Sequence, residues 1–131
     1  MTGWRLGWLV APEEAVNTME VLAQNLFISM STPAQYAALA GFSEGCQSEL
    51  KDRLHVLAER RDYLMPALRQ LGFTIECEPQ GAFYIYANIR AVTALDSQAF
   101  CLRMLEEHGV AITPGTDFGY YNANDFVRFS Y

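Results

Sequence analysis

Hydrophobic residues recur along the chain at two different spacings, and the change from one to the other falls at Gly72. After a short apolar run over residues 6–10, apolar side chains return roughly every three or four positions up to Gly72, which is the repeat of an amphipathic helix. After it, short apolar runs are bounded by glycine, proline and polar residues, a pattern typical of strands, with one further helical repeat between them. The pattern predicts helices over residues 12–27, 32–40, 48–71 and 97–108, and strands over residues 6–10, 73–77, 82–87, 110–113 and 126–131.

Residues at two of the predicted helix starts support these limits. Thr32 is expected to be the N-cap of the second helix, with Pro33 in its first turn. Asp96 or Ser97 is expected to cap the last helix, which Gly109 ends.

The longest predicted helix leads from one part of the chain to another. Pro66 lies inside it and removes a backbone donor, which predicts a kink near Tyr63. Residues 1–45 hold one strand and two helices, too little for a self-sufficient α/β layer, whereas the elements after the long helix describe a compact α+β unit. Because the chain also begins and ends on predicted buried strands, we expect a piece of a larger protein, with a remnant of a large domain over 1–45 and a small C-terminal domain over 46–131.

The composition excludes several classes of protein. With 131 residues, 51% hydrophobic and 18% charged, the chain is neither disordered nor collagen-like. Nine basic residues stand against fifteen acidic ones, for a net charge of −6, which argues against nucleic acid or an anionic membrane as a partner. Three widely spaced cysteines, and no signal peptide or apolar stretch of about 18 residues, indicate a reduced, cytoplasmic protein.

Arg5 is the first candidate for a ligand-binding residue. It lies between Gly3 and Gly7, where the lack of side chains lets backbone and ligand come close. An arginine in this setting can hold a phosphate through parallel charge-assisted hydrogen bonds. A structural alternative is a salt link between strand ends.

Arg128 is the second candidate, because it is a charge in a strongly apolar strand. Alternation places Phe126, Arg128 and Ser130 on one face of that strand. A nearly buried arginine requires a partner. The sequence leaves open whether that partner is Asp125, another protein acid or the carboxylate of a ligand.

Other residues have structural explanations. Lys51 is expected on a solvated helix face, and His55 and His108 are expected to be structural. Tyr84 and Tyr86 line either a pocket or an ordinary sheet face. No Ser-His-Asp set, metal-ligand spacing or glycine-rich phosphate loop is present, so no metal site is expected.

Six sequence segments, in this order, resemble the class I/II (fold type I) pyridoxal-phosphate aminotransferases, of the aspartate aminotransferase kind. The resemblance covers essentially the whole chain and implies an α/β fold, in which a long kinked helix leads into a small α+β domain with a sheet covered by helices. The segments are MTGWRLGWLVAP, STPAQYAAL, AERRDYL, PQGAFYIY, GVAITPGTDFG and VRFSY.

The resemblance implies roles for both arginines. Arg5 corresponds to the arginine that binds the phosphate of the cofactor, pyridoxal 5'-phosphate. Arg128 corresponds to the arginine that clamps the α-carboxylate of the substrate. Gly81, Ala82 and Phe83 match a segment near the substrate entrance, with no direct contact implied.

The resemblance also implies that the catalytic lysine lies outside this chain. In the family pattern the Schiff-base lysine precedes the arginine by about eight residues, which places it some four residues before Met1. The residues that hold the pyridine ring and a terminal helix after VRFSY are missing too. We therefore expect no catalytic residue here, a chain that is about the last third of the enzyme, and an isolated fragment that is inactive.

The implied activity of the whole protein is the transfer of an amino group between an L-amino acid and a 2-oxo acid in amino-acid metabolism. The resemblance also implies a homodimer. A carbon–sulfur lyase or a cyclopropane-forming synthase of the same cofactor class is an alternative, because such enzymes share both arginines. A third hypothesis is an aminotransferase-like effector domain of a transcription regulator.

Overall fold

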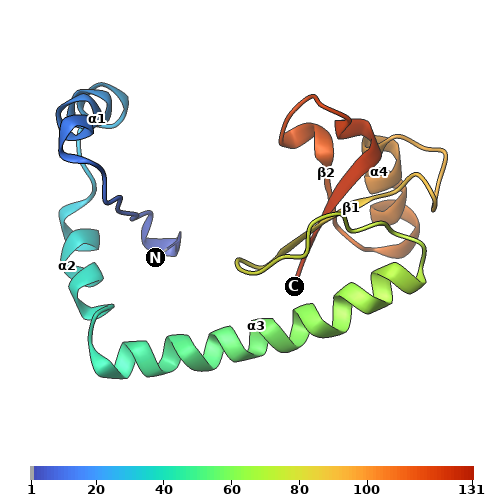
Figure 1. Cartoon of the computed structure of the whole chain (residues 1–131), viewed down its shortest axis with the longest axis horizontal. Coiled ribbons are helices and arrows are strands. Elements are labelled where there is room, and N and C mark those ends of the chain that lie inside the picture. Colours follow the sequence, from blue (N-terminus) through green and yellow to red (C-terminus); the bar gives the residue numbers. More distant parts are fainter. Residues whose placement is uncertain (1) are drawn as a thin grey trace. The chain divides into compact units, whose positions relative to one another are not determined.

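Helices occupy the first part of the chain and a small antiparallel sheet the last part (Figure 1). The computed structural model describes residues 2–131, which divide into an N-terminal unit ending at Asp52 and a C-terminal unit, Arg53–Tyr131. The elements are, in chain order, the 3-10 helix η1 (Thr2–Trp4), α1 (Glu13–Leu26), α2 (Thr32–Ala40), α3 (Glu44–Gln70), β1 (Tyr84–Asn88), α4 (Ser97–His108), β2 (Thr113–Pro114), the 3-10 helices η2 (Gly115–Asp117) and η3 (Ala123–Asp125), and β3 (Phe126–Ser130).

The N-terminal unit contains the two short helices that the sequence predicts. α1 begins directly after Pro12, with two glutamates in its first turn that complement the helix dipole. The N-cap of α2 is Ser31 rather than Thr32, and Thr32 is already helical. The prediction of a strand over residues 6–10 is wrong, since these residues form no regular element and are mostly exposed. A strand requires a hydrogen-bonded neighbour, and the sheet of the described chain lies wholly in the C-terminal unit.

The long helix α3 begins at Glu44, about four residues before the predicted start, and ends at Gln70. Pro66 has no N–H to donate to the carbonyl one turn back. The helix nevertheless continues through Pro66, so the kink predicted near Tyr63 does not end it. Gly72 follows in the left-handed conformation, at φ 97°, and Phe73 N–H closes the helix end on the carbonyl of Leu68 at 3.0 Å.

The sheet has three antiparallel strands in the order β1-β3-β2. β1 pairs with β3 over their whole lengths, from Tyr84 opposite Ser130 to Asn88 opposite Phe126. The segment predicted as a strand at residues 73–77 contributes only an isolated bridge between Thr74 and Asn88. The strand predicted at 82–87 starts two residues later, because Ala82 adopts a left-handed conformation that no strand allows.

One face of the sheet forms the core of the C-terminal unit. Ile85 and Ala87 of β1 and Val127 of β3 are fully buried on this face. Helix α4 covers it (Figure 1) and contributes Phe100 and Cys101 to the buried cluster, which Leu68 of α3, Phe73 and Ile75 complete. The opposite face carries the side chains that alternate with these residues, and it holds Arg128.

Helix α4 has the limits that the sequence predicts. The Asp96 carboxylate accepts a hydrogen bond from Ala99 N–H at 2.8 Å, so Asp96 rather than Ser97 is the N-cap. Gly109 ends the helix at φ 67°.

Candidate functional site

Arg128 lies in the middle of the central strand, β3. Its neighbours in register are Tyr86 on β1 and Thr113 on β2. Directly opposite residues in an antiparallel sheet project to the same face. Arg128 is therefore flanked on both sides by residues that can contact it or a ligand bound to it.

Two aromatic rings cover the guanidinium of Arg128. Its Cζ lies 4.1 Å from the ring centroid of Tyr84 and 4.4 Å from that of Phe118. Cation–π contacts of this kind stabilise a charge that is partly removed from water. Nη2 also donates to Thr113 Oγ1 at 3.4 Å. Nε is buried and has no hydrogen-bond partner among the described residues.

No carboxylate among the described residues pairs with Arg128. Asp125, the acid that the sequence offers as a partner, instead forms an ion pair with Arg90. Aromatic faces and one hydroxyl thus stabilise the Arg128 charge, and no carboxylate among the described residues neutralises it. This arrangement removes the first of the alternatives that the sequence left open, and it favours an external anion.

Aromatic side chains extend the site along the same face of the sheet. Tyr86 stacks on Phe126 with ring centroids 4.9 Å apart and planes within 2° of parallel, and it meets Phe118 edge-on at 6.3 Å. Burial raises the pKa of Tyr86 above its ordinary value. The phenol is therefore a neutral hydroxyl at physiological pH. Beside it lies a pocket of about 470 Å³, lined by Glu76, Cys77, Tyr86, Asn88, Tyr121, Asn122 and Phe126.

Arg5 lies in the N-terminal unit, immediately after η1. It is exposed, has a φ of 55°, and forms no hydrogen bond or ion pair with the described residues. A non-glycine residue in the left-handed region is uncommon and marks a turn that sets the direction of its side chain. A Cβ added at either Gly3 or Gly7 would meet nothing within 4 Å, so the space around Arg5 is open.

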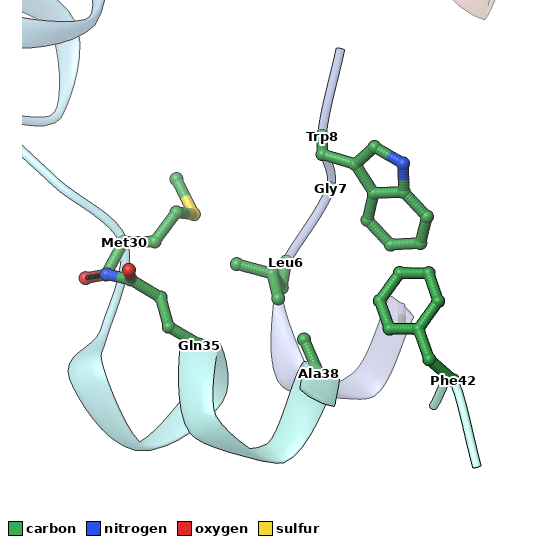
Figure 2. Close-up of a pocket in the computed structure, with 7 residues that line it drawn as sticks. All are labelled: Leu6, Gly7, Trp8, Met30, Gln35, Ala38 and Phe42. Carbon is green, nitrogen blue, oxygen red and sulfur yellow. Dashed lines mark hydrogen bonds between the residues drawn. The ribbon is translucent and has the colours of Figure 1, made fainter. Parts of the chain in front are cut away.

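The residues directly after Arg5, Leu6 and Gly7, help to line a shallow pocket of about 450 Å³ (Figure 2). The rings of Trp8 and Phe42 face each other across one side of it, with centroids 5.7 Å apart. Gln35 donates to the Met30 carbonyl at 3.0 Å on the other side. The pocket is mainly apolar, so Arg5 is the charged group of this region. Arg5 and Arg128 belong to different units of the chain.

The remaining titratable candidates have ordinary surroundings. Lys51 is exposed on α3, and His55 lies 3.3 Å from Glu59 one turn along the same helix. His108 lies 4.0 Å from Glu107 at the end of α4. Among the residues that the structure describes, no three His, Cys, Asp or Glu side chains are grouped to hold a metal ion. No helix among the residues that the structure describes is long and apolar enough to cross a membrane.

The sequence missed two members of the site, Thr113 and Phe118. Both contact Arg128 only because β2 pairs with β3 and the following turn folds back over the sheet. Neither contact follows from local spacing. The only local signal is the Pro114-Gly115 turn, which ends β2 close to Phe118.

Comparison with known proteins identifies the family to which this chain belongs. The family model described as aminotransferase class I and II matches residues 1–131. The chain belongs to this family. The resemblance predicted from the sequence is thereby confirmed.

Class I and II aminotransferases are also the relatives found by sequence and by structure. Valine–pyruvate aminotransferase of Mycobacterium tuberculosis is 38% identical over 131 residues, which cover 100% of this chain and 34% of that protein. A crystal structure of an aminotransferase from Mycobacterium tuberculosis matches with a TM-score of 0.84 at 39% identity, over 99% of this chain and 33% of the other. Aspartate aminotransferase of Thermus thermophilus, solved as a mutant, matches with a TM-score of 0.80 at 33% identity, over 100% of this chain and 35% of the other.

These matches confirm the predicted fold class, that of the fold type I transferases. The chain spans about a third of the length of the curated relatives it matches. Enzymes of this family depend on pyridoxal phosphate and use amino and oxo acids. The donor sets of the two arginines fit such ligands, because Arg5 offers an exposed guanidinium to a phosphate, and Arg128 offers to a carboxylate a guanidinium that no described carboxylate neutralises.

Proposed function

We propose that the whole protein is a pyridoxal-phosphate-dependent aminotransferase that moves an amino group between an L-amino acid and a 2-oxo acid. In this proposal Arg128 binds the α-carboxylate of the substrate and Arg5 binds the phosphate of the cofactor. The observation that carries the proposal is the state of Arg128, whose guanidinium lies between two rings and has no protein carboxylate among the described residues.

The geometry around Arg128 suits a flat, bidentate anion. Tyr84 and Phe118 lie against the guanidinium at 4.1 and 4.4 Å. Stacked rings leave the N–H groups in the guanidinium plane free to bind, which is the arrangement that a carboxylate matches with two parallel hydrogen bonds. Because Nε is buried, the carboxylate would meet the Nη atoms, and Thr113 limits their rotation through Nη2. A substrate whose α-carboxylate is held by Arg128 has its Cα in a fixed position, which favours removal of the Cα proton.

Arg5 supplies the corresponding charge for the cofactor. Its exposed guanidinium and the open space at Gly3 and Gly7 allow a phosphate to approach both the side chain and the backbone. Pyridoxal phosphate, when bound, supplies the electron sink for chemistry at the substrate Cα.

The chain contains one lysine, Lys51, and it is exposed on α3. We propose that the lysine that carries the cofactor belongs to another part of the whole protein, and that residues 1–131 alone are inactive. Adding pyridoxal phosphate to the purified chain should then give neither the visible absorbance of a lysine-bound cofactor nor amino transfer. Both signals appearing together would contradict this part of the proposal.

Replacing Arg128 in the whole protein tests the main proposal. Arg128→Lys keeps the charge but cannot form two parallel hydrogen bonds, so we expect kcat/KM for the amino acid to fall roughly 100-fold, mainly through KM. Arg103→Lys is the control, since Arg103 is exposed and pairs with Glu107 at 2.9 Å on α4. Equal kcat/KM values for the two variants would contradict the proposal. Measuring release of ammonia or pyruvate in the same assay separates amino transfer from the lyase alternative.

The same proposal includes a homodimer that works in the cytoplasm in amino-acid metabolism. Its relatives are named as amino-acid aminotransferases, which supports the substrate class. Light scattering of the whole protein tests the dimer: a mass of one chain at micromolar concentration would contradict it.

A further inference from the structure

Residues 76–83, which we call the strap, leave the sheet after the bridge between Thr74 and Asn88 and return to it at β1. All of them are exposed except Pro79, which is half-buried. Apart from Phe83, which is 39% exposed, burial of apolar surface therefore contributes little to the position of the strap. Specific polar contacts have to fix the rest of it.

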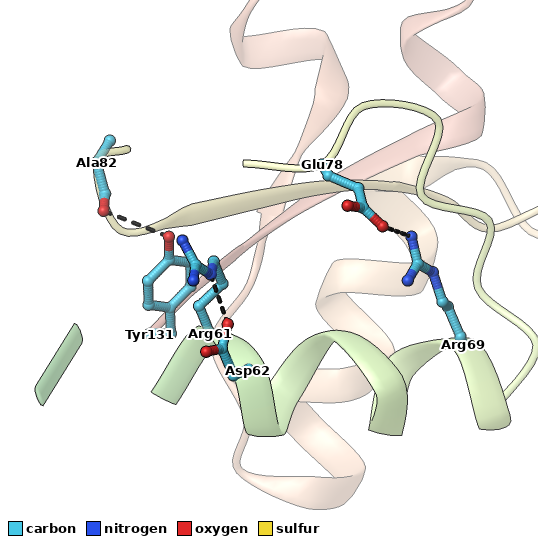
Figure 3. A network of polar contacts seen from close by, with 6 residues as sticks. All are labelled: Arg61, Asp62, Arg69, Glu78, Ala82 and Tyr131. Carbon is cyan, nitrogen blue, oxygen red and sulfur yellow. Dashed lines mark hydrogen bonds and ion pairs between the residues drawn. The ribbon is translucent and has the colours of Figure 1, made fainter. Parts of the chain in front are cut away.

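Three polar contacts hold the strap, and Figure 3 shows two of them, Arg69–Glu78 and Tyr131–Ala82. Arg69 of α3 forms an ion pair with Glu78, with Nη2 and Oε1 2.7 Å apart. Tyr131 N–H donates to the Phe83 carbonyl at 3.0 Å, which extends the ladder between β1 and β3 by one step. The Tyr131 hydroxyl donates to the Ala82 carbonyl at 3.3 Å.

The last of these contacts lies at the least favourable backbone position of the strap. Ala82 has a φ of 56°, in the left-handed region, which alanine seldom occupies. Such a conformation persists only where surrounding contacts hold it. Tyr131 contacts Ala82 and Phe83 together, and its ring is anchored because it packs against the core.

The strap leads directly into the contacts of Arg128. The ring of Phe83, its last residue, lies 4.3 Å from the ring of Tyr84. The Tyr84 ring in turn lies 4.1 Å from Arg128 Cζ. A displacement of the strap at Ala82 would therefore move one of the two rings between which the guanidinium is held.

We propose that Tyr131 and the Arg69–Glu78 ion pair are positioning residues for Arg128. They fix the strap, the strap fixes the Tyr84 ring, and the ring sets the orientation in which the guanidinium meets a carboxylate. The inference rests on the proposed function of Arg128, and it adds residues that do not contact the substrate. A loosened strap would weaken carboxylate binding more than it slows the chemistry at Cα.

Two conservative substitutions test this in the whole protein. Tyr131→Phe keeps the half-buried ring and removes the hydroxyl, and Glu78→Gln keeps the size and removes the charge. For each we expect KM for the amino acid to rise roughly 3- to 10-fold with kcat changed less than about twofold, the size of one lost hydrogen bond. Glu107→Gln is the matched control, because Glu107 forms an exposed ion pair with Arg103 at 2.9 Å that does not involve the strap.

A spectroscopic measurement on residues 1–131 accompanies the kinetics. We expect ring currents to shift the Nε–H signal of Arg128 in a nitrogen-15 NMR spectrum, because the rings of Tyr84 and Phe118 lie 4.1 and 4.4 Å from its Cζ. Tyr131→Phe and Glu78→Gln should move this signal toward the position of a solvent-exposed arginine, and Glu107→Gln should leave it in place. A purely structural role in stability would lower the unfolding temperature without this shift or the change in KM.

The outcomes separate this inference from the proposed function. If Tyr131→Phe and Glu78→Gln match Glu107→Gln in both KM and the Arg128 signal, the inference is overturned. If Arg128→Lys itself leaves KM unchanged, the proposed function fails, whatever the strap variants do.

Discussion

Arg128 shows how a charge can be kept in an apolar strand without a carboxylate partner. Removing an isolated cation from water carries a large free-energy cost. Here the rings of Tyr84 and Phe118 and the hydroxyl of Thr113 share the stabilisation. Because none of these groups neutralises the charge, the guanidinium keeps its affinity for an anion. A protein acid at the same place would compete with a ligand carboxylate.

Gly115, at the edge of this site, is a position where the structure leaves no room for a side chain. It is buried between η3 and β3, and an added Cβ would lie 2.6 Å from the Tyr86 hydroxyl oxygen and 2.8 Å from the Phe126 carbonyl oxygen, and closer still to the Ala123 carbonyl oxygen. Two of these three atoms are backbone, so they cannot turn aside.

We predict that Gly115→Ala lowers the free energy of unfolding by about 1–3 kcal/mol, the usual cost of overpacking. Urea denaturation of residues 1–131, followed by the fluorescence of the aromatic residues, measures it. Gly119→Ala is the control, because a Cβ there would meet nothing within 4 Å. Equal midpoints for the two variants would show that the chain around Gly115 can move away.

At the scale of elements, the helices followed from the sequence better than the strands did. The limits of α4 could be predicted because its cap, Asp96, and its stop, Gly109, are adjacent to it in the chain. The long helix could be predicted despite Pro66, since the apolar repeat continues on both sides of that residue. Helix signals are local, and they do not depend on what the rest of the chain does.

Strands depend on partners, which local patterns do not provide. Residues 6–10 have the composition of a buried strand and form none, because no strand of the described chain lies beside them. Arg128 could be singled out as an unusual charge from its own strand alone. Its contacts with Thr113 and Phe118 could not be predicted, because they depend on another strand. Those contacts exist only once β2 has paired with β3.

Helix α4 carries a titratable group on the face that packs against the sheet. Burial and, to a lesser extent, the negative charge of Asp117 raise the pKa of Cys101 from 9.0 to about 11. The folded state therefore keeps this proton at pH values where the unfolded state has lost it. The contribution of Cys101 to stability is complete below pH 9.0 and is lost as the pH rises through about 11.

We predict that the free energy of unfolding of residues 1–131 decreases between pH 9 and 11, and that Cys101→Ala removes part of this decrease. Urea denaturation at a series of pH values measures both curves. The quantity to compare is the difference in slope between the two curves, because the substitution leaves every other titratable group of the chain in place. Parallel curves would mean that the Cys101 thiol ionises as easily in the folded state as in the unfolded chain.

At the scale of the whole chain, the two units differ in how much core they contain. Nearly all of the buried apolar residues, from Leu68 to Val127, lie in the C-terminal unit, and the N-terminal unit contributes Ala34. No residue of α1 is buried. A helix of 14 residues without tertiary packing has little stability of its own in water. The C-terminal unit has the sheet, α4 and the end of α3 around one cluster.

This asymmetry predicts the pattern of amide hydrogen exchange in residues 1–131. Amides of β1, β3 and α4 should exchange at least about 100-fold more slowly than those of α1 and α2, because the former open only when the core does. Mass spectrometry of peptides from the labelled chain measures the two groups in one sample. Equal protection of α1 and β3 within residues 1–131 would contradict the expectation and would mean that the N-terminal unit gains stability that its buried residues do not explain.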